Sequence, residues 1–372
     1  MLLSCQAGFE SLLVRELTEL QGRASSEHGP GWVRLDELPA PAAAAGRSRE
    51  VDLPGLTFAH LTLLDPVEVR GDSVNGLASR ISEYFLGSLQ GERIEGAWPS
   101  LWFGPAELVG LGRRITAVEH AFGEQLRKKF SRVAKLAVPD LPRGTGVGPV
   151  RGLFVFFSDF GRAFVTRAAF GHGSRRMADD PLAPSRSYLK VEEAYAVLGR
   201  EPRAGETVCD LGAAPGGWSY SAAKRGARVV AIDNGPLKGG ALDHPQIEHR
   251  REDAFKYAPG GAGMASGSSD PAAFDWLFCD LVEEPHHVVR HIVEPWLAQR
   301  WCSHFVINLK FGRVDAVALL RELTAPDSPL VRFAPGTRIR HLFHDREEFT
   351  LVGTVAGAGA ATDARPVQLN HG

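Results

Sequence analysis

Hydrophobic and polar residues follow two different periods along the chain, and each period predicts one kind of element. Near the N-terminus, a helix-like spacing places five apolar residues on one face: Phe9, Leu12, Leu13, Leu17 and Leu20. Further along, the apolar runs Leu153–Phe157 and Ala163–Thr166 flank Gly161, a pattern typical of a β-hairpin. The N-terminal half is therefore expected to mix helices and strands.

From Pro184 onwards the pattern changes to alternating helices and strands. Helices are expected over Tyr188–Leu198 and Gly217–Arg225. Short apolar strands are expected over Thr207–Leu211, Arg228–Ile232, Phe274–Phe278, His304–Leu309 and Phe349–Val355. Several short apolar strands separated by helices are typical of a mostly parallel, doubly wound α/β sheet.

The composition excludes several classes of protein. A length of 372 residues allows two or three domains, and 44% hydrophobic with 23% charged residues is typical of a soluble globular protein. The formal net charge of −2 gives no overall attraction to nucleic acid, so an RNA site needs a local cluster of Lys and Arg. The four cysteines lie far apart, and nothing has the spacing of metal ligands. Since no apolar stretch is long enough for a membrane span, we expect a cytoplasmic protein.

A glycine-rich turn follows the strand Thr207–Leu211 and precedes a helix. Glycines allow the backbone to turn tightly and to approach a ligand closely, and in α/β sheets ligands bind beyond the carboxyl ends of the strands. One such turn alone is equally well explained as a plain connection between a strand and a helix. If it binds a cofactor, the candidate residues are Asp210, Gly212, Ala214, Pro215, Gly216, Gly217 and Trp218.

Three acids at successive strand ends favour cofactor binding. Asp233 is placed to accept both ribose hydroxyls, Asp253 to accept an adenine amino group, and Asp280 ends a further strand. NAD is the obvious rival, but its fingerprint is G-x-G-x-x-G with a pyrophosphate at the helix N-terminus. A carboxylate at Asp210 would repel a pyrophosphate, whereas it suits the amino group and the sulfonium of S-adenosylmethionine. The sequence therefore predicts S-adenosylmethionine as the cofactor.

Two lysines and a glutamate could complete a catalytic group around Asp280. Methyl transfer to a ribose hydroxyl needs a base, and Lys310 is expected to emerge at the same sheet edge as Asp280. A lysine after a strand is usually only solvated. However, Lys190 lies early in the helix Tyr188–Leu198, and two partly desolvated lysines close together would depress the pKa of at least one. Glu347, preferred over Glu348 for its distance from the following strand, would orient the pair together with Asp280.

The residues now assembled resemble a known family. The strings Ser185-Arg-Ser-Tyr-Leu-Lys190, Asp210-Leu-Gly-Ala-Ala-Pro-Gly-Gly-Trp218, Cys279-Asp280, Asn308-Leu-Lys310 and Asp345-Arg-Glu347 resemble the K-D-K-E ribose 2′-O-methyltransferases related to FtsJ. Within that group, Lys190-Val-Glu-Glu-Ala, Asp233-Asn-Gly-Pro, Arg251-Glu-Asp253-Ala-Phe-Lys and His344-Asp-Arg-Glu-Glu are most similar to the RlmM family of bacteria, which modifies a cytidine in 23S rRNA. The resemblance covers roughly residues 176–355. The stretch 260–272 and the tail after Gly357 depart from it.

The resemblance implies roles, a fold and domains. It implies Lys310 as proton acceptor, completed by Lys190, Asp280 and Glu347, with cofactor contacts at Ser187, Ala214–Gly217, Asp233, Asp253 and Asp280. The implied fold class is α/β: a Rossmann-like class I methyltransferase domain over 176–372 with a mostly parallel sheet. It would be preceded by an α+β ferredoxin-like domain over 1–60 and a THUMP-like RNA-binding domain over 61–175.

A basic run in the N-terminal half is a candidate RNA-binding surface. Residues 127–135 hold five positive charges and one aromatic ring, which suits a phosphate backbone and a stacked base, although such runs are more often solvated helix faces. Arg162 and Arg167 in the predicted hairpin would add to it. The candidate residues are Arg127, Lys128, Lys129, Arg132, Lys135, Arg175 and Arg176. The expected partner is 23S rRNA or a large-subunit precursor.

Other functions stay open at this point. The same four side-chain types would serve a 2′-O-methyltransferase of tRNA or of an RNA end. The chain could also be an RNA-binding assembly factor with a vestigial catalytic domain, which the presence of all four types argues against. Methyltransferases of base amino groups usually carry an N/D-P-P-Y/F string where this chain has Asp280-Leu-Val-Glu, and cytosine-C5 enzymes need a cysteine, typically in Pro-Cys, which is absent.

Overall fold

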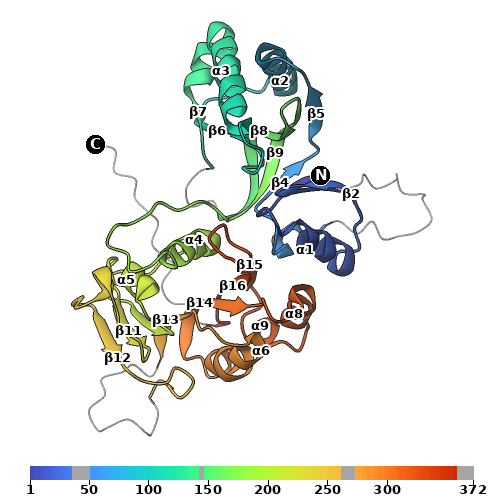
Figure 1. Ribbon diagram of the computed structural model, residues 1–372. Helices are drawn as coiled ribbons and strands as arrows, with labels where there is room; N and C mark the ends of the chain where they lie inside the picture. The colour runs from blue at the N-terminus through green and yellow to red at the C-terminus, as the bar shows by residue number, and fades with distance from the viewer. Residues whose placement is uncertain (36–50, 142–145, 261–272, 358–372) are drawn as a thin grey trace. The chain divides into compact units, whose positions relative to one another are not determined.

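The computed structural model describes residues 1–35, 51–141, 146–260 and 273–357, and the chain divides into two compact units (Figure 1). The first unit is Met1–Ser174 and the second is Arg175–Gly372. The sequence departures predicted at 261–272 and beyond Gly357 lie outside the described residues. Each unit is built around its own sheet.

The first unit contains a nine-stranded sheet with the order β2-β3-β1-β4-β9-β8-β6-β7, and β5 pairs with β9. Its strands are β1 Leu2–Ser4, β2 Ser25–Gly29, β3 Trp32–Leu35, β4 Leu61–Leu64, β5 Val67–Arg70, β6 Trp98–Phe103, β7 Ala137–Val138, β8 Val147–Asp159 and β9 Arg162–His172. Its helices are α1 Glu10–Arg15, which continues as a π-helix over Glu16–Leu20, α2 Val74–Leu89 and α3 Leu111–Lys135. The predicted hairpin is confirmed as β8 and β9.

Both faces of this sheet are buried, which explains the uninterrupted apolar run in β8. Leu153, Val155 and Phe157 lie in one core with residues of α2 and α3, whereas Phe154 and Phe156 lie in a second core. Side chains alternate between the faces of a strand, so a strand that is covered on both faces reads as continuously apolar. Figure 1 shows α2 and α3 side by side over the same part of the sheet.

The strand pairing runs across the domain boundary predicted at residue 60. Strand β1 pairs with β3 on one side and with β4, which begins at Leu61, on the other. The 1–60 and 61–175 segments therefore share one sheet. Their assignment as ferredoxin-like and THUMP-like domains stays a prediction.

The second unit contains a seven-stranded sheet with the order β12-β11-β10-β13-β14-β16-β15. Its strands are β10 Thr207–Leu211, β11 Arg228–Ile232, β12 Ile247–Arg250, β13 Phe274–Cys279, β14 Cys302–Lys310, β15 Arg338–Arg340 and β16 Glu348–Thr354. The five strands from β12 to β14 run parallel, and β16 is antiparallel to both β14 and β15. This arrangement confirms the predicted Rossmann-like, mostly parallel sheet.

Helices flank this sheet on both sides in Figure 1, with α4 and α5 on one side. The helices are α4 Tyr188–Leu198, α5 Gly217–Ala223, α6 Pro285–Val288, α7 Glu294–Ala298, α8 Ala316–Leu323 and α9 Pro329–Phe333, with a π-helix over Val289–Val293 between α6 and α7. No helix in the described part of the chain is both long and apolar enough to cross a membrane.

Candidate active site

The order of the strands creates a topological switch point at β10. The chain leaves β10 towards β11 and β12 on one side and returns to β13 on the other, and in such sheets ligands bind beyond the strand ends where the direction changes. Asp210, Asp233 and Asp280 lie at the carboxyl ends of β10, β11 and β13. Burial raises the pKa of Asp210 to about 7, and the negative charges of Asp280 and Asp233 raise it as well. The predicted convergence of these acids is therefore present.

Asp210 and Asp233 support the glycine-rich turn. Asp210 is buried, and its Oδ2 accepts a hydrogen bond of 2.6 Å from the Ser219 hydroxyl in α5. The Oδ2 of Asp233 accepts from the Ala214 amide at 3.0 Å, which ties the end of β11 to the turn, and its Oδ1 accepts from the Gly235 amide at 2.7 Å. The Pro215 carbonyl accepts from the Lys238 amide at 2.9 Å. The shape of the turn is thus set by the acids around it.

The glycines of the turn are required by protein packing more than by a ligand. Gly216 has a φ of +106°, and a Cβ there would lie 2.5 Å from the Ala241 Cβ. A Cβ at Gly217 would lie 2.9 Å from the Ser185 Oγ. The space beside these two glycines is occupied by neighbouring segments and not left for a ligand, because the chain before α4 passes directly over the start of α5.

Two of the residues predicted to bind the cofactor, Trp218 and Asp253, make hydrogen bonds to other parts of the protein. Trp218 is only 2% exposed, and its indole N–H donates to the Ser187 carbonyl at 2.8 Å. It joins the start of α4 to the start of α5 from within the core. Asp253 is exposed, and its carboxylate accepts from the Phe255 amide at 3.0 Å and pairs with Lys256 at 3.4 Å. Their contacts with a cofactor stay predictions.

The carboxylates at these strand ends fit a cationic ligand. Asp210, Asp233 and Asp280 would repel a pyrophosphate and attract an ammonium or a sulfonium group. The residues available to hold such a ligand are Asp233, Asp280 and the backbone of the turn from Gly212 to Gly217. Among the residues that the structure describes, no group of three or more His, Cys, Asp or Glu side chains could hold a metal ion.

Two lysines and two carboxylates, among them Asp280, form a connected cluster at the same edge of the sheet. Lys310 is the last residue of β14, and its Nζ donates to the Asp280 Oδ1 at 2.6 Å and also to the Glu348 Oε2. The Lys190 Nζ, from the first turn of α4, donates to the Glu348 Oε1. The side chain of Glu348 is 5% exposed, and that of Lys190 is 12% exposed. One carboxylate therefore binds both ammonium groups, one at each oxygen.

The glutamate of this cluster is Glu348, so the choice of Glu347 was wrong. Lys310 and Glu348 are direct cross-strand partners in the β14·β16 pair, and such partners share a face of the sheet. Glu347 precedes the strand, is exposed, and lies beside Gly312. The sequence predicts a strand that starts at Phe349. Because β16 begins one residue earlier, Glu348 is already a strand residue, opposite Lys310.

The electrostatics of the cluster also differ from expectation. Burial raises the pKa of Glu348, but the charges of Lys190 and Lys310 outweigh it and hold that pKa at about 2. Burial lowers the pKa of Lys310, yet Asp280 and Glu348 together raise it above its ordinary value. For Lys310 the predicted depression of the pKa is therefore not found, because its ammonium group is bonded to two carboxylates.

Comparisons with known proteins agree with this architecture. A family model described as FtsJ-like methyltransferase matches residues 183–310. A ribosomal RNA large subunit methyltransferase M from Alkalilimnicola ehrlichii is 32% identical, over 96% of this chain and 95% of its own length. The chain belongs to the methyltransferase M family. Proteins of the same name from Stenotrophomonas maltophilia and Thauera aminoaromatica are 31% and 32% identical, over 94% and 93% of this chain and 95% and 93% of their own lengths.

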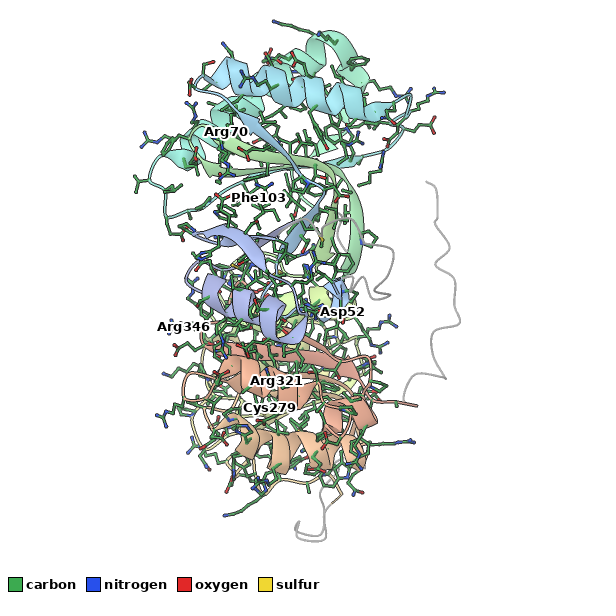
Figure 2. All side chains as sticks on the ribbon, turned by 90° about the vertical axis from the view of Figure 1, so that its right-hand side faces the viewer. Asp52, Arg70, Phe103, Cys279, Arg321 and Arg346 are labelled. Atoms are coloured by element: carbon green, nitrogen blue, oxygen red, sulfur yellow. The ribbon has the colours of Figure 1, made fainter. Side chains whose placement is uncertain are left out.

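Membership of the methyltransferase M family confirms the resemblance seen in the sequence and the prediction of an enzyme. The predicted cofactor, S-adenosylmethionine, is the one that FtsJ-like methyltransferases use. The family match extends over the residues that hold the turn, Lys190, Asp280 and Lys310, while Glu348 lies beyond the segment matched by the FtsJ-like model. In Figure 2, Cys279, which directly precedes Asp280, lies inside the second unit.

The basic run predicted to bind RNA lies at the C-terminal end of α3. The helix buries a stripe of apolar residues, among them Phe122 and Leu126, and all five basic side chains are exposed: Arg127, Lys128, Lys129, Arg132 and Lys135. Phe130 is 45% exposed and has non-helical backbone angles, φ −140° and ψ 62°. Five basic side chains and an aromatic ring are therefore exposed along the last turns of α3, with Arg127 paired to Glu124.

The other arginines considered for RNA differ in their surroundings. Arg162 is bonded to Glu27 and Glu68, and Arg167 is buried against the Gly152 carbonyl and Glu92. Since carboxylates within the first unit neutralise both, they do not add to a surface for RNA. In the second unit, Arg176 is exposed and lies 5.6 Å from the ring centroid of Phe343, and the Arg175 amide donates to a buried glutamate, Glu193.

Sequence reasoning missed three buried polar residues behind the cluster. Asn308 and Thr350 are fully buried cross-strand partners two positions from Lys310 and Glu348. Glu193 in α4 is also fully buried, and its carboxylate accepts from the backbone amides of Phe343 and His344. The sequence does carry a sign of Asn308 and Thr350. Each interrupts an apolar strand two residues away from a charged residue of the cluster, and residues two apart share a face of a strand.

Proposed function

We propose that this protein transfers the methyl group of S-adenosylmethionine to the ribose 2′-hydroxyl of a nucleotide, a cytidine, in the 23S rRNA of the large ribosomal subunit. The observation that supports this most strongly is the bridging of Lys190 and Lys310 by Glu348, with Lys310 also bonded to Asp280. The set consists of two lysines and two acids, as in K-D-K-E ribose methyltransferases. The names of the relatives supply the substrate class.

In this mechanism the second unit supplies a base and holds it. The cofactor supplies an electrophilic methyl group next to a positive charge. Lys310, once neutral, accepts the proton of the 2′-hydroxyl at its Nζ, while Asp280 and Glu348 restrict the directions in which that nitrogen points. Lys190, held on the other oxygen of Glu348, adds positive charge near the oxygen that loses its proton.

Replacement of the base tests the chemistry. Lys310→Met keeps the length of the side chain and removes the amine, so methyl transfer is expected to fall by about 10²- to 10⁴-fold. Binding of S-adenosylmethionine, measured by calorimetry, should be retained or become tighter, since methionine removes the ammonium group that competes for the Asp280 carboxylate. Substantial methylation by Lys310→Met would show that another group accepts the proton.

The identity of the RNA is tested separately. Naked 23S rRNA, assembled large subunits and tRNA are each incubated with the enzyme and labelled cofactor, and ribose methylation is mapped by its resistance to alkaline cleavage. We expect one modified cytidine in 23S rRNA. Modification of tRNA or of an RNA end instead would assign the enzyme a different substrate. RNA binding without any methyl transfer would favour an assembly factor.

We further propose that the first unit binds RNA through the exposed basic run of α3. A variant with neutral residues at all five basic positions removes the charges without touching the buried stripe of that helix. Each lost phosphate contact should reduce the slope of log K against log salt by about 0.7 to 0.9. An unchanged slope would refute the role. A variant of Arg113 and Arg114, at the other end of α3, provides a control with the same kind of charge.

A further inference from the structure

Behind the lysine and carboxylate cluster, a row of buried polar groups connects to the Asp280 carboxylate. The side-chain amide of Asn308 donates to the Asp280 Oδ1 at 3.2 Å, on the same oxygen that accepts from Lys310. The Thr350 hydroxyl lies 2.7 Å from the Asn308 Oδ1 and 2.9 Å from the Asp345 Oδ2. Asn308, Thr350 and Asp345 are at most 1% exposed.

The directions of these hydrogen bonds are fixed by counting protons. Asp280 is ionised where it binds the ammonium of Lys310, so it can only accept, and the NH₂ group of Asn308 must face it. The opposite orientation of the amide would place its oxygen against a carboxylate oxygen. The Asn308 Oδ1 therefore faces Thr350, and the single proton of the Thr350 hydroxyl is used in that contact.

This count leaves the contact between Thr350 and Asp345 without a proton unless Asp345 supplies one. An ionised Asp345 would present an acceptor to a hydroxyl oxygen whose proton is already used. A neutral carboxyl can donate to Thr350 from its Oδ2 and still accept there from the Leu342 amide, at 2.9 Å. In the described part of the chain, the buried Oδ1 of Asp345 has no hydrogen-bond partner, which costs less for a neutral carbonyl oxygen than for a carboxylate.

We propose that a one-way chain of hydrogen bonds, starting at a protonated Asp345, positions the base Lys310. The chain passes from Asp345 through Thr350 and Asn308 to the Asp280 carboxylate. Thr350, Asn308 and Asp345 touch neither substrate nor cofactor in this scheme and are positioning residues. The inference deepens the proposed function and rests on it, because the orientation of Lys310 matters only if Lys310 is the base.

The surroundings of Asp345 favour its neutral form. Burial and, to a smaller extent, the negative charge of Glu348 raise its pKa to about 7, against the opposing effects of Lys190 and of the Leu342 amide. The second buried acid nearby, Glu193 of α4, has its pKa raised mainly by burial and also by Asp345. The acids Glu348 and Glu193 and one ammonium group, that of Lys190, face Asp345. A negative charge on Asp345 itself is therefore disfavoured.

The functional test uses the full chain and a matched pair of variants. Thr350→Val removes the hydroxyl at nearly constant volume, and we expect kcat to fall about 10- to 100-fold while KM for RNA and the Kd of S-adenosylmethionine stay within about twofold. Thr350→Ser keeps the hydroxyl and should restore kcat to within about threefold of the native enzyme. A purely structural role for Thr350 would alter stability and both binding constants together, and full activity of Thr350→Val would overturn the proposal.

A spectroscopic test does not depend on activity. Infrared spectra of protein carrying isotope-labelled aspartate, taken near pH 6, should contain the C=O band of a protonated carboxyl that Asp345→Asn removes and Asp210→Asn retains. Absence of that band would overturn the protonated state of Asp345. Lys310→Met in the same assays separates the two proposals. If Lys310→Met retains activity, the proposed base is wrong. If Lys310→Met is inactive and Thr350→Val is fully active, Lys310 remains the proposed base and the chain of hydrogen bonds is refuted.

Discussion

Replacement of Glu348 by glutamine tests the assignment of the charged cluster most directly. The change keeps the shape of the side chain and removes its charge, which leaves the ammonium groups of Lys190 and Lys310 without the carboxylate that joins them. Glu347→Gln is the matched control, since it makes the same chemical change one residue earlier at an exposed position. The two variants differ only in whether the lost charge lies in the cluster.

The expected magnitude follows from the pKa of Glu348. The two lysines hold this pKa at about 2, compared with an ordinary value of 4.5, which corresponds to a stabilisation of about 3 kcal/mol at neutral pH. Loss of one partner of a buried ion pair usually costs about 3 to 5 kcal/mol, so the two lines of reasoning agree. Glu347→Gln should change the free energy of unfolding by no more than about 0.5 kcal/mol.

The dependence on pH provides a second, independent check. The folded-state pKa of Glu348 is lower than its unfolded value, so its stabilisation is fully present above 4.5 and is lost as the pH falls towards 2. The gap between the native protein and Glu348→Gln should therefore shrink over that range. Urea unfolding followed by tryptophan fluorescence measures the gap at each pH. Equal effects of Glu347→Gln and Glu348→Gln at pH 7 would refute the assignment.

Three further substitutions test the surroundings of the site by urea unfolding. Gly217→Ala places a Cβ 2.9 Å from the Ser185 Oγ and should destabilise the second unit by about 1 to 3 kcal/mol. Ser219→Ala removes the hydroxyl that donates to buried Asp210 and should cost about 1 to 3 kcal/mol, with a larger loss above pH 7, where more of Asp210 must ionise. Glu193→Ala leaves three backbone amides without their acceptor and should cost at least about 3 kcal/mol, and Glu193→Gln less.

The fold of the second unit could be predicted because its strands are short, apolar and separated by amphipathic helices. Thr207–Leu211, Phe274–Cys279 and Cys302–Lys310 are largely buried, so the sequence marks each of them by an apolar run. The edge strand β12, Ile247–Arg250, is partly exposed and carries no such run. The pairing of β1 with β4 could not be predicted in the same way. It joins residues about sixty positions apart, and no local periodicity reports such a partner.

The candidate site could be predicted in its residue types and not in its register. Lys310, Lys190 and Asp280 were found because each ends a strand or begins a helix at the edge where ligands bind. The choice between Glu347 and Glu348 depended on a strand boundary, and only the pairing of β16 with β14 shows that Glu348 lies opposite Lys310. Asn308 and Thr350 were missed because a buried polar pair gains meaning only once its partner across the sheet is known.

The raised pKa of Lys310 implies that its proposed role as a base is linked to the binding of the cofactor. Desolvation alone lowers this pKa, but Asp280 and Glu348 raise it, so the free enzyme holds Lys310 protonated at neutral pH. Asp280 also belongs to the group of acids at the strand ends, where its charge acts on Asp210. A cation bound there draws on the same carboxylate and repels the ammonium group, which lowers the pKa of Lys310. The alkaline rise of kcat should therefore occur at lower pH than that of kcat/KM for S-adenosylmethionine, and coincident profiles would contradict this linkage.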